Sequence, residues 1–221
     1  MVKTTVFIYT AFHDLVIFIS LLYSLYYLRK IRTVDYLKYF PLYTVISLAV
    51  DLTFYFNKSL GNLEVNIFLF LEFIFFYNFY WKILNDKKSR IAIIFLSVMY
   101  LVLVIVMLYM YINSSNYTFF VLLKKRSFIE LMALDNIFIV IPAILYYKVL
   151  FLSPIKKLKE NPIFLIVTGI LIGFSIMIPV DAMFWVIKSY DINLFLYLYI
   201  LNAFGYIIIH YCFIKSYKLL K

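Results

Sequence analysis

Long apolar runs separated by short polar connections make up almost the whole chain. Each run has about the 20 residues that a membrane-spanning helix needs. A transmembrane barrel would instead show strands of about ten residues in which apolar and polar positions alternate. The pattern therefore predicts an all-α integral membrane protein, one transmembrane domain over residues 1–221, with seven transmembrane helices at 6–28, 37–56, 65–84, 91–112, 127–151, 162–187 and 192–214.

The composition indicates the same class of protein. The 221 residues are 66% hydrophobic and only 14% charged, which is more apolar surface than a soluble domain of this length can bury. The net charge of +10 does not indicate nucleic-acid binding, because the basic residues lie mostly in the connections between runs, as they do in membrane proteins. We therefore expect a multi-pass protein of the cytoplasmic membrane. Its surroundings are the lipid bilayer, and we expect no nucleic-acid partner.

The basic residues also predict an orientation. Fifteen of the 21 Lys and Arg residues fall on one side of the membrane if the N-terminus is outside. The positive-inside rule makes that side the cytoplasm, so we expect the N-terminus out and the C-terminus in. The triplet Lys124-Lys125-Arg126 is the exception, and we expect it at the outer rim, where Arg126 can pair with Glu130 on one helix face.

Five of the apolar runs each carry an acidic residue well inside the run. At a rise of about 1.5 Å per residue, all five lie roughly 8–12 Å below the outer end of their helix. A charged group inside a bilayer costs about 2.5–3.5 kcal/mol, so these groups should face an outward-facing acidic cavity, where each charge opposes ionisation of the next. The alternative is that each carboxylate reaches outer water or bonds a neighbouring Tyr, Asn or Lys. The five candidate binding residues are Asp14, Asp51, Glu72, Asp135 and Asp181.

Other polar residues suggest a path across the membrane. Asn202, Tyr206 and His210 follow one another at i, i+4 and i+8, on one face of the last helix, and we expect them beneath the acidic layer. His13 begins a similar stripe on the first helix. These groups could equally bond across helix interfaces. His13 could also hold a divalent cation together with the carboxylates, although bonding to a neighbour is the simpler use, so the metal remains unknown.

The stretch "VDLTFYFNKS" in the second run has an echo, "VDAMFWVIKS", in the sixth. The match suggests parallel repeats, 6–84 and 127–214, joined by the uncharged linker helix 91–112. This 3+1+3 arrangement resembles the architecture of SWEET sugar transporters in helix count and topology, but the chain lacks the proline–glutamine pair of that family's relatives. Seven helices in this orientation also resemble rhodopsins, yet the last run has no mid-membrane lysine for a retinal Schiff base.

The chain carries no catalytic motif for acyl transfer, zinc hydrolysis, phosphate binding or dithiol chemistry, and no cofactor is expected. Gly169 and Gly173 form a GxxxG pattern that suits close helix packing within the monomer or, alternatively, dimerisation. A transporter or channel for a cation or protonated small solute therefore ranks first. The alternatives are a seven-helix sensor or receptor that signals through a separate partner protein and, third, an intramembrane enzyme acting on lipid.

Overall fold

The computed structural model describes residues 2–114, 129–152, 158–183 and 192–220. The structure is all-helical, with 90% helix and no strand among the described residues. A short 3-10 helix, Leu158–Glu160, precedes α8. The helices are α1 (Val2–Tyr26), α2 (Leu28–Arg32), α3 (Phe40–Phe56), α4 (Lys58–Ile83), α5 (Lys87–Ser114), α7 (Ile129–Leu152), α8 (Pro162–Ala182) and α10 (Ile192–Lys218).

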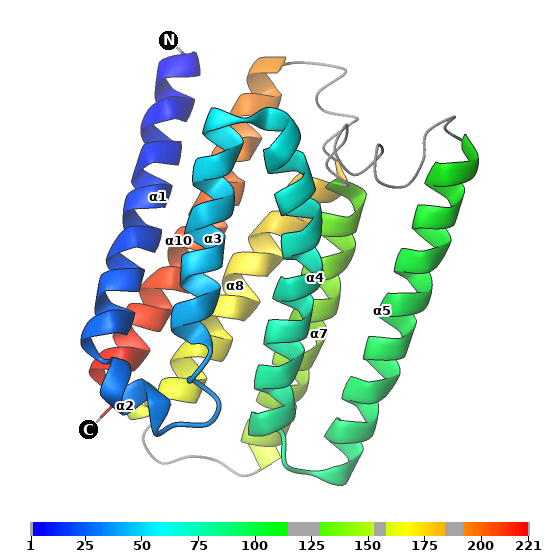
Figure 1. Ribbon diagram of the computed structural model, residues 1–221. Helices are drawn as coiled ribbons and strands as arrows, with labels where there is room; N and C mark the ends of the chain where they lie inside the picture. The colour runs from blue at the N-terminus through cyan, green and yellow to red at the C-terminus, as the bar shows by residue number, and fades with distance from the viewer. Residues whose placement is uncertain (1, 115–128, 153–157, 184–191, 221) are drawn as a thin grey trace.

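The long helices form a bundle in which α8 and α10 are central (Figure 1). α10 packs against α1 and α8, α8 packs against α7, and α3 packs against α1 and α4. α5 stands at one edge of the bundle. Its main contacts among the described helices are with α4 and α7. The two chain ends lie at opposite ends of the bundle, and α2 and the α4–α5 connection lie at the same end as the C-terminus.

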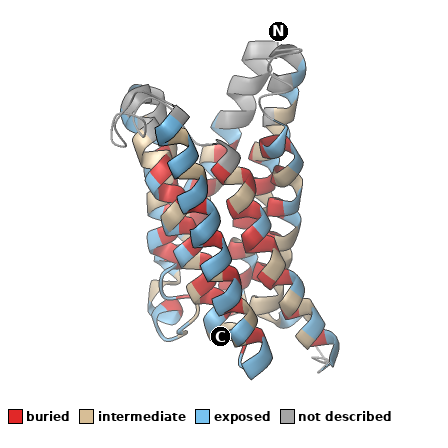
Figure 2. Cartoon of the chain, turned by 90° about the vertical axis from the view of Figure 1, so that its right-hand side faces the viewer, coloured by how far each residue is buried: buried red, intermediate tan, exposed pale blue. Residues whose placement is uncertain are grey.

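The surface of the bundle is apolar where a membrane would meet it. Within the described residues, four helices are long and apolar enough to cross a membrane, while α1 and α3 contain the shorter apolar stretches Ala11–Tyr26 and Phe40–Thr53. The exposed faces of the helices turn outward and the buried faces turn toward the bundle interior (Figure 2). On α5 the outward side chains include Phe95 and Ile105, both 63% exposed. The chain therefore has the helices of a multi-pass membrane protein.

Local sequence explains where several helices begin. Asn57 is extended and separates α3 from α4, and its side-chain oxygen accepts a hydrogen bond from the Leu60 amide at 3.1 Å. Asn161 caps α8 in the same way, with Pro162 at the first helical position, where the missing proline N–H costs nothing. Asp86 accepts a hydrogen bond from the Ser89 amide at 2.8 Å at the start of α5. This bond to the charged form lowers the pKa of Asp86.

Each predicted apolar run overlaps one long helix, but several of the predicted ends were wrong. The third run was predicted to begin at residue 65, whereas α4 begins at Lys58, and the sixth was predicted to end at 187, whereas α8 ends at Ala182. The second run was predicted to begin at residue 37, but α3 begins at Phe40, with Pro41 in its first turn. Residues 127–128 and 184–187, which were included in the fifth and sixth runs, lie outside the described residues, as does the triplet at 124–126. The internal repeat stays a prediction.

Close contact between α8 and α10 explains the glycine pattern. A Cβ atom placed on Gly173 would lie 2.6 Å from the Gly205 carbonyl oxygen, and one placed on Gly169 would lie 2.6 Å from the Cys212 Cβ atom. Small residues let two membrane helices approach this closely. Packing within the monomer, the first of the two predicted uses of the GxxxG pattern, is therefore the use that the structure shows.

Candidate functional site

Asp181 on α8 ties three helices together. Its Oδ2 atom accepts a hydrogen bond from Asn136 of α7, and its Oδ1 atom accepts one from Asn202 of α10, both at 2.8 Å. Asp181 and Asn136 are buried. Two amide donors thus compensate a carboxylate that would otherwise be costly in an apolar interior.

A second group of polar side chains joins α1 to α3. The Nδ1 atom of His13 lies 3.1 Å from Asp14 Oδ1 and 3.9 Å from Asp51 Oδ2. The possible ligand atoms of these three residues all lie within 4.8 Å of one another. The Asp51 side chain is 35% exposed and the Asp14 side chain 17%, so this group is the more open part of the site.

These three residues fit a divalent cation in part. Two ligands at right angles on one Mg²⁺, each at about 2.1 Å, lie about 3 Å apart. The separation of His13 and Asp14 matches that value, whereas Asp51 would have to move closer to His13. Carboxylates suit Mg²⁺, Ca²⁺ or Mn²⁺, whereas an imidazole suits Zn²⁺, Cu²⁺, Fe²⁺ or Ni²⁺, so this mixed set of ligands does not select one ion.

Glu72 on α4 is more deeply buried, at 1% exposed. The Tyr43 hydroxyl of α3 donates a hydrogen bond of 2.6 Å to its Oε1 atom. The Oε2 atom has no hydrogen-bond partner within the described residues. Glu72 also interacts electrostatically with Asp51 and Asp181, one acid from each of the two groups just described.

Asp135 on α7 is completely buried. Neither of its carboxylate oxygens has a hydrogen-bond partner of good geometry in the described part of the chain. It interacts electrostatically with Glu72 and with the Tyr100 hydroxyl of α5. The Tyr100 hydroxyl is placed to donate to this carboxylate, so Asp135 is a buried acid with few donors, which is costly in an apolar interior.

Tyr206 of α10 is the common neighbour of these acids. Its hydroxyl interacts electrostatically with four carboxylates, which are those of Glu72, Asp181, Asp51 and Asp135. Its ring meets the edge of the His13 ring at a centroid distance of 5.6 Å. Four of the predicted acids therefore lie near Tyr206, and Asp14 lies beside His13, whose ring contacts the Tyr206 ring. That the five acids act as one site stays a prediction.

The predicted polar path meets the acids at Asn202. The Asn202 amide donates a hydrogen bond to Asp181 at 2.8 Å, and the path itself stays a prediction. His210 is fully buried and stacks on Tyr43, with ring centroids 6.3 Å apart. Neither of its ring nitrogens has a hydrogen-bond partner within the described residues. Ser20 and Ser24 of α1 are also buried.

Sequence reasoning missed three partners of the acids. Asn136 directly follows Asp135, so the pair of adjacent polar residues in "ALDN" was a usable signal. Tyr43 and Tyr100 gave no such signal, because each is one of 22 tyrosines. Which tyrosine meets a carboxylate depends on how the helices rotate against one another.

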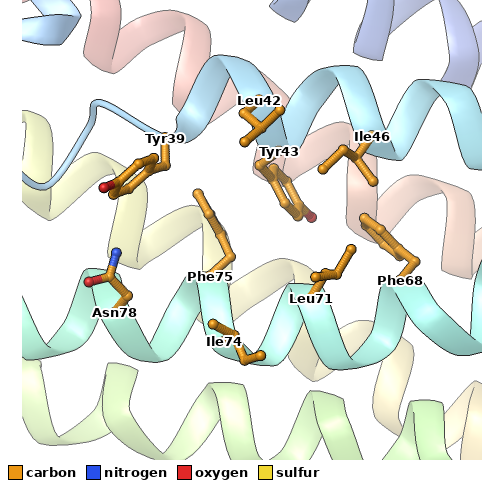
Figure 3. A pocket seen from close by; sticks show the side chains of 9 residues that line it. All are labelled: Tyr39, Leu42, Tyr43, Ile46, Phe68, Leu71, Ile74, Phe75 and Asn78. Atoms are coloured by element: carbon orange, nitrogen blue, oxygen red, sulfur yellow. The ribbon is translucent and has the colours of Figure 1, made fainter.

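A groove of about 400 Å³ opens between α3 and α4 on the side of the bundle (Figure 3). Apolar and aromatic side chains line most of it, and it does not contain the five acids. Tyr43 connects the two features, because its ring lines the groove and its hydroxyl bonds Glu72. The outward-facing acidic cavity stays a prediction.

No protein-family model matches the chain, and no curated protein or solved structure matches it significantly.

Proposed function

We propose that the protein is a transporter or channel for a cation or a small protonated solute, and that its connected carboxylates form the binding site. One observation carries the proposal. Four acidic residues from four helices lie near Tyr206 inside an otherwise apolar bundle, and Glu72, Asp135 and Asp181 among them are buried. Ionisable groups within a membrane are expensive and by default mark a site or an ion path.

The chemistry of the site favours a positively charged ligand. Acceptor oxygens come from Asp14, Asp51, Glu72, Asp135 and Asp181. Among the described residues, His13 is the titratable base in contact with Asp14 and Asp51. A bound cation provides the counter-charge that packed carboxylates lack. In this proposal the partly exposed Asp14 and Asp51 admit the ligand beside the buried His13, and the buried Glu72 and Asp181 hold it.

We further propose seven spans in the cytoplasmic membrane, with the N-terminus outside and the C-terminus inside. The opposite positions of the chain ends support an odd number of spans. The basic α2 and the α4–α5 connection lie at the C-terminal end, and Lys30 donates a hydrogen bond to the Leu220 carbonyl oxygen at 3.2 Å. This basic end suits the cytoplasmic side.

Reporter fusions test this topology. Fusions after Arg32, Lys88, Lys157 and Lys221 should all report the cytoplasmic side, because each lies in a basic connection or at the C-terminus. A fusion at Asn57, between α3 and α4, should report the outside. An outside signal after Lys157 would contradict the assignment of the last three spans.

Flux through the wild-type protein tests the function itself. In proteoliposomes that contain a pH-sensitive dye, we expect saturable movement of at least one of Na⁺, K⁺, Mg²⁺ or methylammonium, compared with empty liposomes. The same ligand should raise the melting temperature, and less so at low pH, because protons compete for the carboxylates that bind it.

The other functions predict different results in this assay. A receptor that signals through a partner protein would show cation-dependent stabilisation without flux. Absence of both effects would mean that the acids only bond their neighbours, and an enzyme acting on lipid would then have to be considered.

A further inference from the structure

The groove between α3 and α4 lies on the exposed side of the bundle and adjoins the proposed transport site at Tyr43, whose ring lines the groove. Its volume of about 400 Å³ falls within the range of about 300–1,000 Å³ that is typical of ligand pockets. Three of its apolar side chains, Leu42, Leu71 and Ile74, are 58%, 43% and 62% exposed. The buried ring of Tyr43 and the ring of Phe75 lie between the two helices and close the groove toward the bundle interior (Figure 3).

One end of the groove is polar and positively charged. Tyr39 and Asn78 lie there, opposite each other on α3 and α4 (Figure 3). The Nζ atoms of Lys38 and Lys82 lie 5.0 and 5.2 Å from the centroid of the Tyr39 ring, within the range of cation–π contacts. Both ammonium groups therefore stand beside the same end of an apolar groove.

These two cations are only partly neutralised by the protein. Lys82 donates one hydrogen bond to the Asp35 carbonyl oxygen at 2.8 Å, which leaves two of its three donors. Lys38 lies 3.9 Å from the Asp35 carboxylate, whose side chain is 89% exposed. A pair this exposed contributes little and is easily exchanged for another anion.

We propose that this groove binds an anionic phospholipid. One acyl chain lies along the apolar walls between α3 and α4, the phosphate lies against Lys38 and Lys82, and the Asn78 amide donates to a glycerol ester oxygen. Basic pockets between membrane helices recognise anionic headgroups in this way. The site does not depend on the proposed transport function.

Charge complementarity and shape separate this site from the rest of the lipid-facing surface. The outward face of α5 is also apolar. Its exposed lysines, Lys87 and Lys88, lie at the start of the helix, and its residues are not part of the groove described above. The α3–α4 groove combines a hollow with two cations at its end. A zwitterionic lipid would match the hollow and leave the excess positive charge unmatched.

Lipid titration of the wild-type protein is the first test. We expect phosphatidylglycerol added to the protein in neutral detergent to give discrete lipid adducts in native mass spectrometry and a higher melting temperature, with phosphatidylcholine giving much less of both. Glycerol 3-phosphate should have no effect, since it lacks the acyl chain. Equal effects of the two lipids, or an effect of glycerol 3-phosphate equal to that of phosphatidylglycerol, would overturn the proposal.

Matched charge variants locate the headgroup. The double variant K38Q/K82Q should bind phosphatidylglycerol roughly 25-fold more weakly, because each cation near the headgroup contributes on the order of fivefold. The control K87Q/K88Q removes two exposed lysines at the same end of the bundle and should bind normally. Equal losses in the two double variants would mean general attraction to the basic end, and would overturn the site.

Matched bulky variants locate the acyl chain. I74W places an indole in the groove from an exposed position, whereas I94W adds the same bulk on the exposed face of α5. We expect I74W to lose the lipid adduct and I94W to keep it, while both keep the melting temperature of the wild type without lipid. Retention of the adduct in I74W would overturn the assignment of the chain to this groove.

Discussion

The Gly173→Val variant is expected to lower the free energy of unfolding by about 3 kcal/mol or more, at the upper end of what overpacking costs. Even a Cβ atom at this position would lie 2.6 Å from the Gly205 carbonyl oxygen and 2.5 Å from Ile209 Cγ1. The carbonyl belongs to the α10 backbone, so it cannot turn aside as a side chain could. α10 would have to move as a unit, and with it Asn202 and Tyr206, which contact the acids.

The matched control for this variant is Ser175→Val. Ser175 is two residues further along α8 and exposed, so the same β-branched side chain would extend into lipid or detergent there. Thermal unfolding in detergent should show a large loss of stability for the glycine variant and little change for the control. If the two variants have the same melting temperature, α8 and α10 do not approach each other as closely as the structure shows.

The helices were the most predictable part of the fold. A membrane helix must satisfy its own backbone hydrogen bonds and cover itself with apolar side chains, so each helix leaves a long apolar run in the sequence. Local chemistry gave some ends as well, as at Pro162, where a proline follows the capping Asn161. The start of α3 was predicted three residues too early. Leu37 and Tyr39 are apolar, so the turn that precedes Pro41 could not be told from the apolar run that follows it.

The candidate site was predictable in its acids and unpredictable in their partners. A carboxylate inside an apolar run is conspicuous because of its desolvation cost, which is why Asp135 and Asp181 could be named from the sequence. Their neighbours depend on helix rotation and depth. That Asn202 donates to Asp181 could not be predicted, since residue counting along α10 does not show which acid of a neighbouring helix it meets.

The lipid-facing groove had no signature in the sequence at all. Its lining residues are apolar, as they are throughout the outward faces of α3 and α4. A hollow arises only from the sizes of side chains on two helices at a given separation, and periodicity does not encode that separation. Only the two lysines at its end were visible, and they were counted as part of the general basic character of the cytoplasmic side.

Two variants inside the bundle should separate binding from passage. In the Asp181→Asn variant, the residue keeps its shape but loses its charge and one of its two acceptor oxygens, so Asn136 and Asn202 lose the carboxylate to which both donate. Hydrogen bonds to charged groups contribute about 1.5–3 kcal/mol, which corresponds to a loss of ligand affinity on the order of ten- to hundredfold. Flux should fall by a similar factor at subsaturating ligand. The Asp35→Asn variant, which changes an exposed carboxylate outside the bundle, should leave both unchanged.

The His210→Phe variant should lose flux and keep binding. The His210 ring is fully buried, stacks on Tyr43, and makes no hydrogen bond within the described residues. Phenylalanine can keep the stacking, so a purely structural histidine predicts equal or greater stability and unchanged flux. If the buried imidazole instead passes protons or ligand inward from the acids, proteoliposome flux should fall at least tenfold. That factor corresponds to the energy of one hydrogen bond to a charged group.

The cation-dependent rise in melting temperature should persist, because His210 lies outside the hydrogen bonds that hold Asp181. Unchanged flux in His210→Phe would rule out this residue as part of the path, and unchanged flux in both variants would rule out the transport function of the site.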